Sequence, residues 1–299
     1  MEVSGTTKID GKLRNTELKP LNIDDMISLS KTIRTDIIRE TNHAYSGHPG
    51  GSLSGTDILC VLFSYFLRFN PDNPCAAGRD RFIMSKGHCA PLIYAILARM
   101  GYFPPEELLT FRFTGSRLQG HPNMLKCPGI EVSTGSLGQG LSVGLGMALG
   151  ARLNRGDEFV YVMNGDGEMQ EGQIWEAYMA AGHYKVDSLI TLIDNNNLQI
   201  DGNVNEVMTI YPLDDKIKAF NWNVMKANGH DFKQIYDAIK AARANKGSGK
   251  PTAIIFKTHK GMGVSFMLDK AEWHGKPPND KEAEIALKDI EAMKYPWGQ

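Results

Sequence analysis

Apolar residues recur along this chain with two different spacings, and the alternation between them predicts its fold. Two short runs, 159–163 and 189–193, are almost wholly apolar, which is typical of strands buried in a parallel sheet. In the stretches around them, apolar residues return every three or four positions, as on helices that pack by one face. We therefore expect an α/β fold: a mainly parallel sheet with right-handed crossovers and helices on both faces.

The same pattern places the other elements. Strands are expected at 81–85, 159–163, 189–193, 223–227 and 252–256. Helices are expected at 56–67, 91–100, about 140–154 and about 170–182, with a short acidic helix that starts at 104–105.

Polar residues mark the starts of three further helices. Asn22 is expected to cap a helix whose isoleucines fall mainly on one face. Asp231 with Gln234, and Asn279 with Glu282, have the spacing of capping boxes. The last of these helices carries one apolar stripe, which we expect to pack against its own domain.

Length favours one large domain. At 299 residues and 42% apolar composition, the chain can bury roughly 75% of the surface that it would expose when unfolded. Residues 1–21 are expected to be an N-terminal leader and residues 22–299 a single domain. The only linker candidate, 245–250, is too short to separate two domains.

Charge and hydropathy exclude several classes of partner. The 33 basic and 34 acidic residues give a net charge of −1, so we expect no binding to nucleic acid or to an anionic membrane. No apolar run approaches about 18 residues, and the polar N-terminus has no signal-peptide core. We therefore expect a cytoplasmic protein that captures any anionic ligand locally.

Hard oxygen ligands follow the two apolar runs. Asp166 lies in a Gly-Asp-Gly after the first run, and Asn196 follows the second, 30 residues later. This interval suits a helix and a return strand, which would bring the two side chains together at the ligand-binding edge of the sheet. Gly165 and Gly167 leave room for a phosphate, and a helix opening near Glu168 would direct N–H groups at it. An isolated Gly-Asp-Gly is usually only a turn, but this pairing predicts a magnesium-bound diphosphate.

Four histidines occur in glycine-bordered turns, at His48, His88, His121 and His274. One such histidine alone is more often a satisfied polar group than a functional one, whereas four together indicate a site. Competing motifs are absent from the sequence: 138–144 only approximates a dinucleotide fingerprint, and there is no P-loop and no HExxH.

Seven motifs together resemble the transketolase family. They are SGHPGG, DRFIMSKGH, QGHP, TGSLGQGLS, GDGEMQEG, DNNNLQIDG and EWHG, in the family's order between Ile23 and Gly275. The resemblance covers only the diphosphate-binding half of that family. It implies the thiamine-diphosphate-binding PP-domain fold and the N-terminal subunit of a split transketolase, whose pyrimidine-binding half is a separate polypeptide.

The resemblance also implies roles for individual residues. Asp166, Asn196 and the Leu198 carbonyl resemble the ligands of Mg²⁺, or of another divalent cation such as Ca²⁺ or Mn²⁺. The implied thiamine diphosphate contacts are His88, Gly135, Ser136, Leu137, Gly165, Asp166, Gly167, Glu168, Asn196 and His274. The implied catalytic residues are His48, His88, His121, His274 and Glu171.

Two of these positions bear on assembly and cofactor retention. Glu171 resembles a carboxylate that meets a partner glutamate across a subunit interface, although it could simply be a charge at a helix N-terminus. Lys86 stands where the family commonly has asparagine, and we expect it to add a cation near the diphosphate. The implied assembly is an α2β2 heterotetramer with the C-terminal subunit.

The implied reaction moves a two-carbon ketol unit from a ketose phosphate to an aldose phosphate, in the pentose phosphate pathway. The isolated chain is expected to be inactive, because the glutamate that activates the cofactor belongs to the other half. Three alternatives stay open at this point. They are a transketolase for an unusual sugar, another split thiamine enzyme (deoxyxylulose-phosphate synthase or the α subunit of a 2-oxo acid dehydrogenase), and a non-catalytic cofactor-binding subunit.

Overall fold

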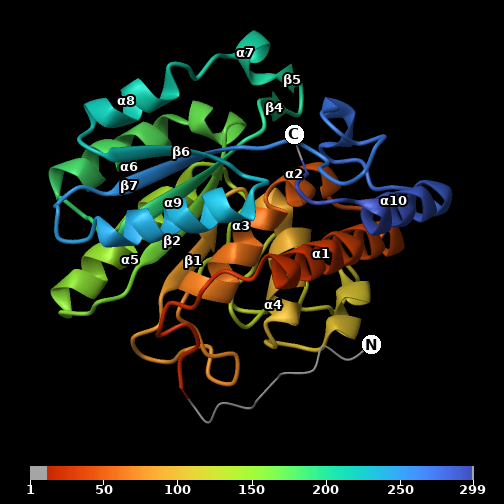
Figure 1. The fold of residues 1–299 in the computed structure, drawn as a ribbon, viewed down its shortest axis with the longest axis horizontal. Helices are drawn as coiled ribbons and strands as arrows, with labels where there is room; N and C mark the ends of the chain where they lie inside the picture. The colour runs from red at the N-terminus through yellow and green to blue at the C-terminus, as the bar shows by residue number, and fades with distance from the viewer. Residues whose placement is uncertain (1–11, 298–299) are drawn as a thin grey trace.

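A computed structural model describes residues 12–297 and contains the predicted parallel sheet (Figure 1). Its strands are β1 (Arg81–Met84), β2 (Val160–Gly165), β3 (Leu189–Asn195), β6 (Asn223–Asn228) and β7 (Thr252–Lys257). They pair in the order β1-β2-β3-β7-β6, and every pair is parallel. A small antiparallel pair, β4 (Leu198–Gln199) and β5 (Gly202–Asn203), lies outside this sheet. The expected α/β fold class is confirmed.

Helices cover both faces of the sheet because the strand side chains alternate between two cores. On β2, Tyr161 and Met163 point into a core shared with α1 (Ile23–His43), α3 (Thr56–Val61), α4 (Ala90–Arg99) and α9 (Phe232–Ala244). Val160 and Val162 point into the other core, shared with α5 (Gln139–Leu153), α6 (Gly172–His183) and α8 (Leu213–Ala219). The apolar runs reflect this burial on both sides.

The first part of the chain is more broken than expected. Instead of one helix over 56–67, α2 (Pro49–Ser54) precedes α3, and a π-helical turn, η1 (Leu62–Phe66), follows it. Pro49 occupies the first turn of α2, where its missing N–H costs nothing. The glycines of SGHPGG therefore lie in and beside a helix rather than in a plain turn.

The remaining elements of the described chain are five short turns or helices and one longer C-terminal helix, α10. They are η2 (Gly87–Cys89), η3 (Pro105–Thr110), η4 (Gly167–Gln170), α7 (Val204–Val207), η5 (Ala271–Trp273) and α10 (Asp280–Ala292). The predicted stripe on α10 packs within the domain, since Ala286 and Ile290 are buried in the core that α1 also lines. Within residues 12–297, none of the helices combines the length and apolar character needed to cross a membrane.

Two of the three predicted helix caps are confirmed. The Asn22 side chain accepts from Asp24 N and Asp25 N, and Asn279 forms a complete capping box with Glu282. The capping box at Asp231 is wrong. Asp231 does cap α9, but the Gln234 side chain accepts from Asn228 N at 3.0 Å instead of returning to the cap backbone.

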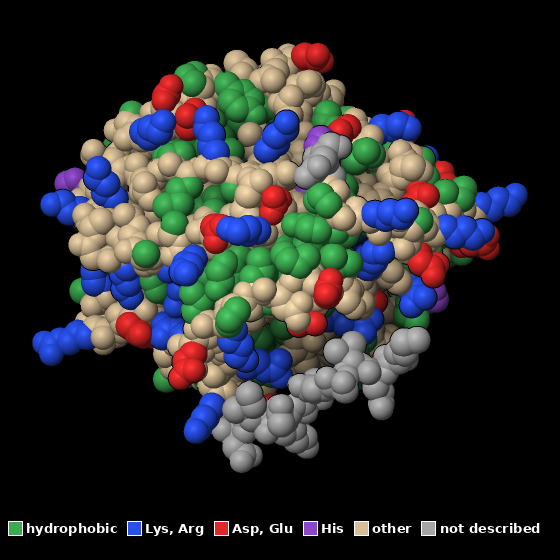
Figure 2. Space-filling model, in the orientation of Figure 1, with side chains coloured by type: hydrophobic (Ala, Val, Ile, Leu, Met, Phe, Trp, Pro, Cys, Tyr) green, Lys and Arg blue, Asp and Glu red, His purple; other side chains and the backbone are tan. Residues whose placement is uncertain are grey.

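Residues 1–11 of the predicted leader lie outside the described residues. The part of it that is described contacts the domain: Arg14 N donates to Phe69 O at 2.7 Å, and Asn15 Nδ2 donates to Phe63 O at 2.8 Å. On the face seen in Figure 2, Lys and Arg side chains are interspersed with Asp and Glu. The sequence predicts this mixture from its balanced charge.

Glu40 on α1 gives the first testable prediction, a pH-dependent loss of stability. Its side chain is buried, and in the described part of the chain neither carboxyl oxygen has a hydrogen-bond partner. Burial, reinforced by the Asp36 carboxylate, raises the pKa of Glu40 well above its usual range. The folded chain therefore holds a proton that the unfolded chain releases above about pH 4.3, so stability falls as pH rises.

Glu40→Gln cannot ionise and should remove this slope. We expect urea unfolding of the unchanged chain to show a loss of stability as the pH rises from about 5 to about 8, of up to about 1.4 kcal/mol per pH unit through this group, because the unfolded chain has released the proton that the folded chain still binds. The variant should lose correspondingly less. Glu284→Gln, at an exposed position on α10, is the matched control. Equal pH slopes in all three proteins would contradict the prediction.

Candidate functional site

The two motif loops meet at the carboxyl ends of β2 and β3. These strands pair in register from Val160 with Leu189 to Gly165 with Asp194, so Asp166 and Asn196 emerge from neighbouring strand ends. The loops are also bonded directly, since the Asp166 carboxylate accepts from Asn197 N. The interval of 30 residues thus brings the two predicted ligand side chains to one edge of the sheet.

Asp166 is a buried carboxylate whose negative charge a bound cation would stabilise. It is 2% exposed, and burial, followed by the nearby Asp194 carboxylate, raises its pKa to about 7. With the Asn196 amide oxygen and the Leu198 carbonyl, it would offer the hard oxygens that Mg²⁺ binds. Within residues 12–297, no cluster of three or more His, Cys, Asp or Glu suits a metal ion. A divalent cation held here would therefore depend on amide and backbone oxygens as well.

A cavity of about 390 Å³ lies beside these residues, and most of the predicted site residues line it. Its lining includes His88, Gly135, Leu137, Gly165, Asp166, Gly167, Glu168, Glu171, Asn196, Leu198 and His274. Ser136 does not belong to this lining and is exposed. His48 and His121 also lie outside the lining, although both are close to it.

The four predicted histidines form one cluster. The rings of His88 and His274 stack with centroids 4.9 Å apart. His48 lies 5.4 Å from His88 and 5.7 Å from His274, and His121 lies 6.5 Å from His48. Residues spread over more than 200 positions of sequence therefore converge at one end of the cavity.

These imidazoles are kept neutral. Burial, then the positive charge of Arg112, lowers the pKa of His48 to about 4. Burial and Lys260 lower the pKa of His274 to about 3, and burial with His274 lowers the pKa of His88 well below its usual range. A neutral imidazole has one nitrogen with a lone pair, so each ring can accept one hydrogen bond and donate another.

Lys260 is a site residue that the sequence analysis missed. It is 1% exposed, lines the cavity, and its Nζ lies 2.8 Å from His274 Nδ1. Burial lowers its pKa to about 8. It follows β7 in the segment Lys257 to Gly261, which matches no motif used above, and only the position of β7 beside β3 brings it to the site.

Lys86, which we expect to add a cation near the diphosphate, lines this cavity but is already paired with a carboxylate. Lys86 is buried against Asp194 in an ion pair, and its Nζ donates to Gly51 O at 2.9 Å. Burial opposes its charge, but the Asp194 carboxylate outweighs burial and raises the pKa of Lys86. Since Asp194 also accepts from Ser54 and Thr258, this lysine balances a buried carboxylate instead of adding net charge.

The local secondary structure at Glu168 differs from the one expected. No α-helix opens there, because residues 167–170 form a short 3₁₀ turn and α6 begins at Gly172. The Glu168 carboxylate accepts from Ser85 Oγ at 2.5 Å, Gly138 N at 2.9 Å and Gly165 N at 3.0 Å. It lines the cavity, yet its hydrogen bonds tie the Gly-Asp-Gly loop to the glycine-rich 134–140 loop.

The 134–140 loop lies against the start of the His88 turn. A Cβ on Gly87 would stand 2.6 Å from Gly135 N, closer than atoms pack, so glycine is required before His88. Gly138 has φ +85° and directly precedes α5, which glycine adopts without strain. These contacts explain why His88 and Leu137 can share one cavity.

Glu171 is exposed at the N-terminal end of α6 and also lines the cavity. Its side chain makes no capping hydrogen bond to the helix. The simpler interpretation, a charge near a helix N-terminus, is therefore not supported by a hydrogen bond from the α6 backbone to this carboxylate. The carboxylate is free to meet a group from outside this chain.

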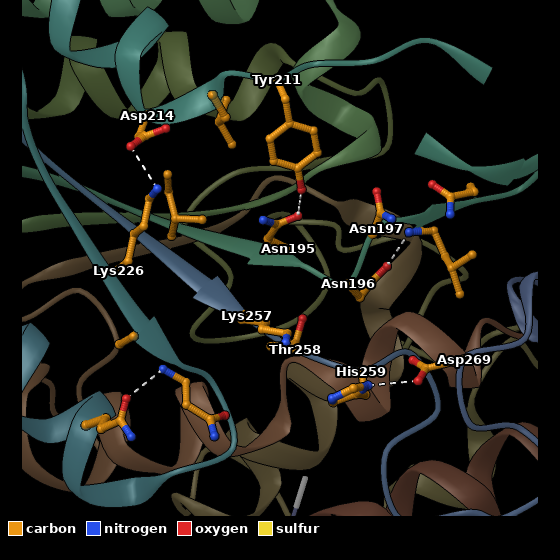
Figure 3. Close-up of a pocket in the computed structure, with 17 residues that line it drawn as sticks. Asn195, Asn196, Asn197, Tyr211, Asp214, Lys226, Lys257, Thr258, His259 and Asp269 are labelled. Carbon is orange, nitrogen blue, oxygen red and sulfur yellow. Dashed lines mark hydrogen bonds and ion pairs between the residues drawn. The ribbon is translucent and has the colours of Figure 1, made fainter. Parts of the chain in front are cut away.

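A second and larger cavity, of about 860 Å³, opens at the ends of β3, β6 and β7 (Figure 3). Asn196 and Leu198 line both cavities, so this loop separates them. The polar side chains of the larger cavity largely satisfy one another, through Tyr211–Asn195 at 2.7 Å, Lys226–Asp214 at 2.8 Å and His259–Asp269 at 2.8 Å. The smaller cavity, with two imidazoles in its wall and the buried Asp166 carboxylate, is the better candidate site.

Known proteins share this arrangement. The family model described as "Transketolase, thiamine diphosphate binding domain" matches residues 24–297. A subunit of the apulose-4-phosphate transketolase of Phocaeicola vulgatus is 40% identical over 90% of this chain and 95% of its own length. The 6-deoxy-6-sulfo-D-fructose transketolase subunit SqwG of a Clostridium species is 39% identical over 89% of this chain and 96% of its own length.

Longer relatives match only in part. The transketolase of Homo sapiens is 39% identical over 86% of this chain, which spans 41% of the human protein. The crystal structure of a transketolase from Campylobacter jejuni superposes with a TM-score of 0.85 and 33% identity, over 91% of this chain and 43% of that one. This chain therefore corresponds to about two-fifths of such proteins.

Proposed function

This chain belongs to the transketolase family, as a thiamine-diphosphate-binding domain, and from that premise we propose that it is the N-terminal subunit of a split transketolase. With a separate pyrimidine-domain subunit it transfers a two-carbon ketol unit from a ketose phosphate to an aldose phosphate. The observation that carries this proposal is the convergence of Asp166, Asn196, His88 and His274 on one cavity, with His48 and His121 in the same histidine cluster.

The diphosphate is held through a divalent cation at the strand ends. Asp166, Asn196 and the Leu198 carbonyl hold Mg²⁺, which offsets the cost of burying the Asp166 carboxylate beside Asp194. Gly167 N–H and His88 meet the diphosphate, and Gly135 to Leu137 pack near the aminopyrimidine. When bound, thiamine diphosphate supplies the carbanion chemistry for cleaving a ketose carbon–carbon bond.

The histidine cluster binds the sugar hydroxyls and transfers protons. His88 and His274, which line the cavity, would contact the reactive end of the cofactor, and His48 and His121 would contact the sugar hydroxyls. Because burial keeps these imidazoles neutral, they can accept a proton from a substrate hydroxyl and return it. Lys260, bonded to His274, orients that ring and adds positive charge close to the anionic ligands.

A partner subunit completes the site. The exposed Glu171 at the start of α6 meets a glutamate of the partner subunit, and the two carboxylates share a proton. The relatives that are named as transketolase subunits match this chain over almost their whole length, which supports a separate C-terminal subunit here. An α2β2 heterotetramer is the proposed assembly.

The names of the similar subunits bear on the donor sugar. The relatives that this chain covers almost completely are named for apulose 4-phosphate and for 6-deoxy-6-sulfo-D-fructose. This favours an unusual ketose as donor beside the pentose phosphates. A screen of donors should therefore include xylulose 5-phosphate, fructose 6-phosphate, apulose 4-phosphate and 6-deoxy-6-sulfofructose.

Reconstitution tests the proposal. The purified chain is mixed with a candidate pyrimidine-domain subunit from the same genome, thiamine diphosphate, Mg²⁺, one donor and ribose 5-phosphate. We expect the mixture to transfer the two-carbon unit, and either polypeptide by itself to be at least about 100-fold slower, because proton-transfer groups are divided between them. Transfer by this chain alone would contradict partner dependence. Consumption of pyruvate or a branched oxo acid instead would identify a different thiamine enzyme.

A further inference from the structure

His230 is a wholly buried histidine outside the cluster described above. It lies between β6 and α9, and its ring bonds on both sides. His230 Nδ1 lies 2.8 Å from Asp57 Oδ2, and its Nε2 lies 2.9 Å from the backbone N of His259. The ring therefore bridges α3, which carries Asp57, and the segment 258–261 that follows β7.

The two bonds fix the tautomer of this ring. A backbone N–H can only donate, so His230 Nε2 must carry the lone pair, and the ring proton must be on Nδ1. That proton is donated to the Asp57 carboxylate, which also accepts from Arg34 and from Trp297 Nε1. Burial favours the uncharged acid, but Arg34 and the bond from His230 outweigh it and hold the pKa of Asp57 below its usual range.

The segment 258–261 carries Lys260 into the candidate site. It is held by four backbone hydrogen bonds, in which Thr258 N donates to Asn195 O, His259 N to His230 Nε2, Asp269 N to Lys260 O, and Gly261 N to Gly50 O. Only the bond at His259 uses a side chain as the acceptor. It lies directly beside Lys260, whose Nζ is 2.8 Å from His274.

We propose that His230 is a positioning residue for Lys260. Asp57 locks the tautomer of His230, the ring accepts the His259 N–H, and the segment then holds Lys260 against His274. Without this acceptor the partly buried His259 N–H would lose its partner, and the segment would open more often. The link to cofactor binding rests on the proposed function, whereas the placement of Lys260 does not.

Three substitutions separate the hydrogen bond from simple packing. His230→Gln can place a carbonyl oxygen where Nε2 lies, His230→Asn can reach only Asp57, and His230→Phe keeps the ring but bonds to neither. The readout is acetylation of Lys260 in the full chain by acetic anhydride, measured by peptide mass spectrometry. The exposed Lys281 serves as the internal reference. Calorimetry then gives the affinity of the reconstituted complex for thiamine diphosphate with Mg²⁺.

We expect Asn and Phe to accelerate acetylation of Lys260 about ten-fold, the effect of leaving one partly buried donor unpaired, and Gln to stay within about two-fold of the unchanged chain. Cofactor affinity should weaken in the same order. Unchanged acetylation in the Asn and Phe variants, or equal acceleration in all three, would overturn the proposal. If either the Asn or the Phe variant does not fold, the comparison between the Gln variant and the other one decides.

If acetylation responds as expected while even the unchanged complex binds no thiamine diphosphate, the proposed function fails and the positioning role stands. If the complex binds thiamine diphosphate but the acetylation rate of Lys260 is the same in all His230 variants, the positioning role fails and the proposed function stands. A surface control, His183→Asn on α6, should alter neither readout.

Discussion

Asp166→Asn is expected to abolish the Mg²⁺-dependent binding of thiamine diphosphate while leaving the chain folded. The substitution keeps the size of the side chain but removes the charge that faces the proposed cation. Even substitutions one layer outside a metal site typically cost 10–100-fold in affinity, so losing this ligand should cost more than about 100-fold. The fold should survive, because Asp166 lies at a strand end and an amide oxygen can still accept one backbone N–H.

Thermal unfolding of the reconstituted complex measures this loss directly. At a ligand concentration about 100 times the dissociation constant, binding stabilises a folded protein by about 2.7 kcal/mol, which the variant should not show. Asp201→Asn, at an exposed position beyond the same site, is the matched control and should respond normally to the cofactor. A variant stabilised as much as the control would remove Asp166 from the proposed metal site.

The sequence predicts the sheet and its ligand edge well because both depend on local pattern. Strands buried on both faces must be almost wholly apolar, so β2 and β3 are visible as runs, and parallel neighbours end at the same edge. This is why the amino-acid pattern alone places Asp166 and Asn196 together. The four histidines are visible in the sequence because each has a glycine close beside it, although His48 precedes a helix and His88 lies in a 3₁₀ turn.

Residues that depend on the packing of distant segments could not be predicted. Lys260 reaches His274 only because β7 inserts between β3 and β6, which no motif reveals. The ion pair of Lys86 could not be predicted for the same reason, because its partner Asp194 is 108 residues away in the sequence. The expected helix start near Glu168 is a short 3₁₀ turn, and the Glu168 carboxylate bonds the backbone of its own loop at Gly165 and of the 134–140 loop at Gly138, which the sequence does not reveal.

His88→Ala and His274→Ala are each expected to lower kcat of the reconstituted complex by at least about 100-fold, the usual contribution of a positioned acid or base. The two rings stack at 4.9 Å on the cavity wall, so each removal also exposes the other to water. Exposure would weaken the burial that lowers the pKa of the remaining imidazole, which would then rise toward its usual range.

Activity and titration together distinguish a catalytic role from a structural one. The pH profile of kcat in either variant should move its acidic limb to higher pH, because the remaining histidine must now lose a proton to act as a base. His183→Ala, on α6, removes a histidine from the last turn of a helix away from this cavity and should change neither kcat nor the profile. If alanine at His88 and at His274 leaves both quantities unchanged, the chain retains the cofactor fold without using these imidazoles, and a non-catalytic cofactor-binding subunit becomes the better interpretation.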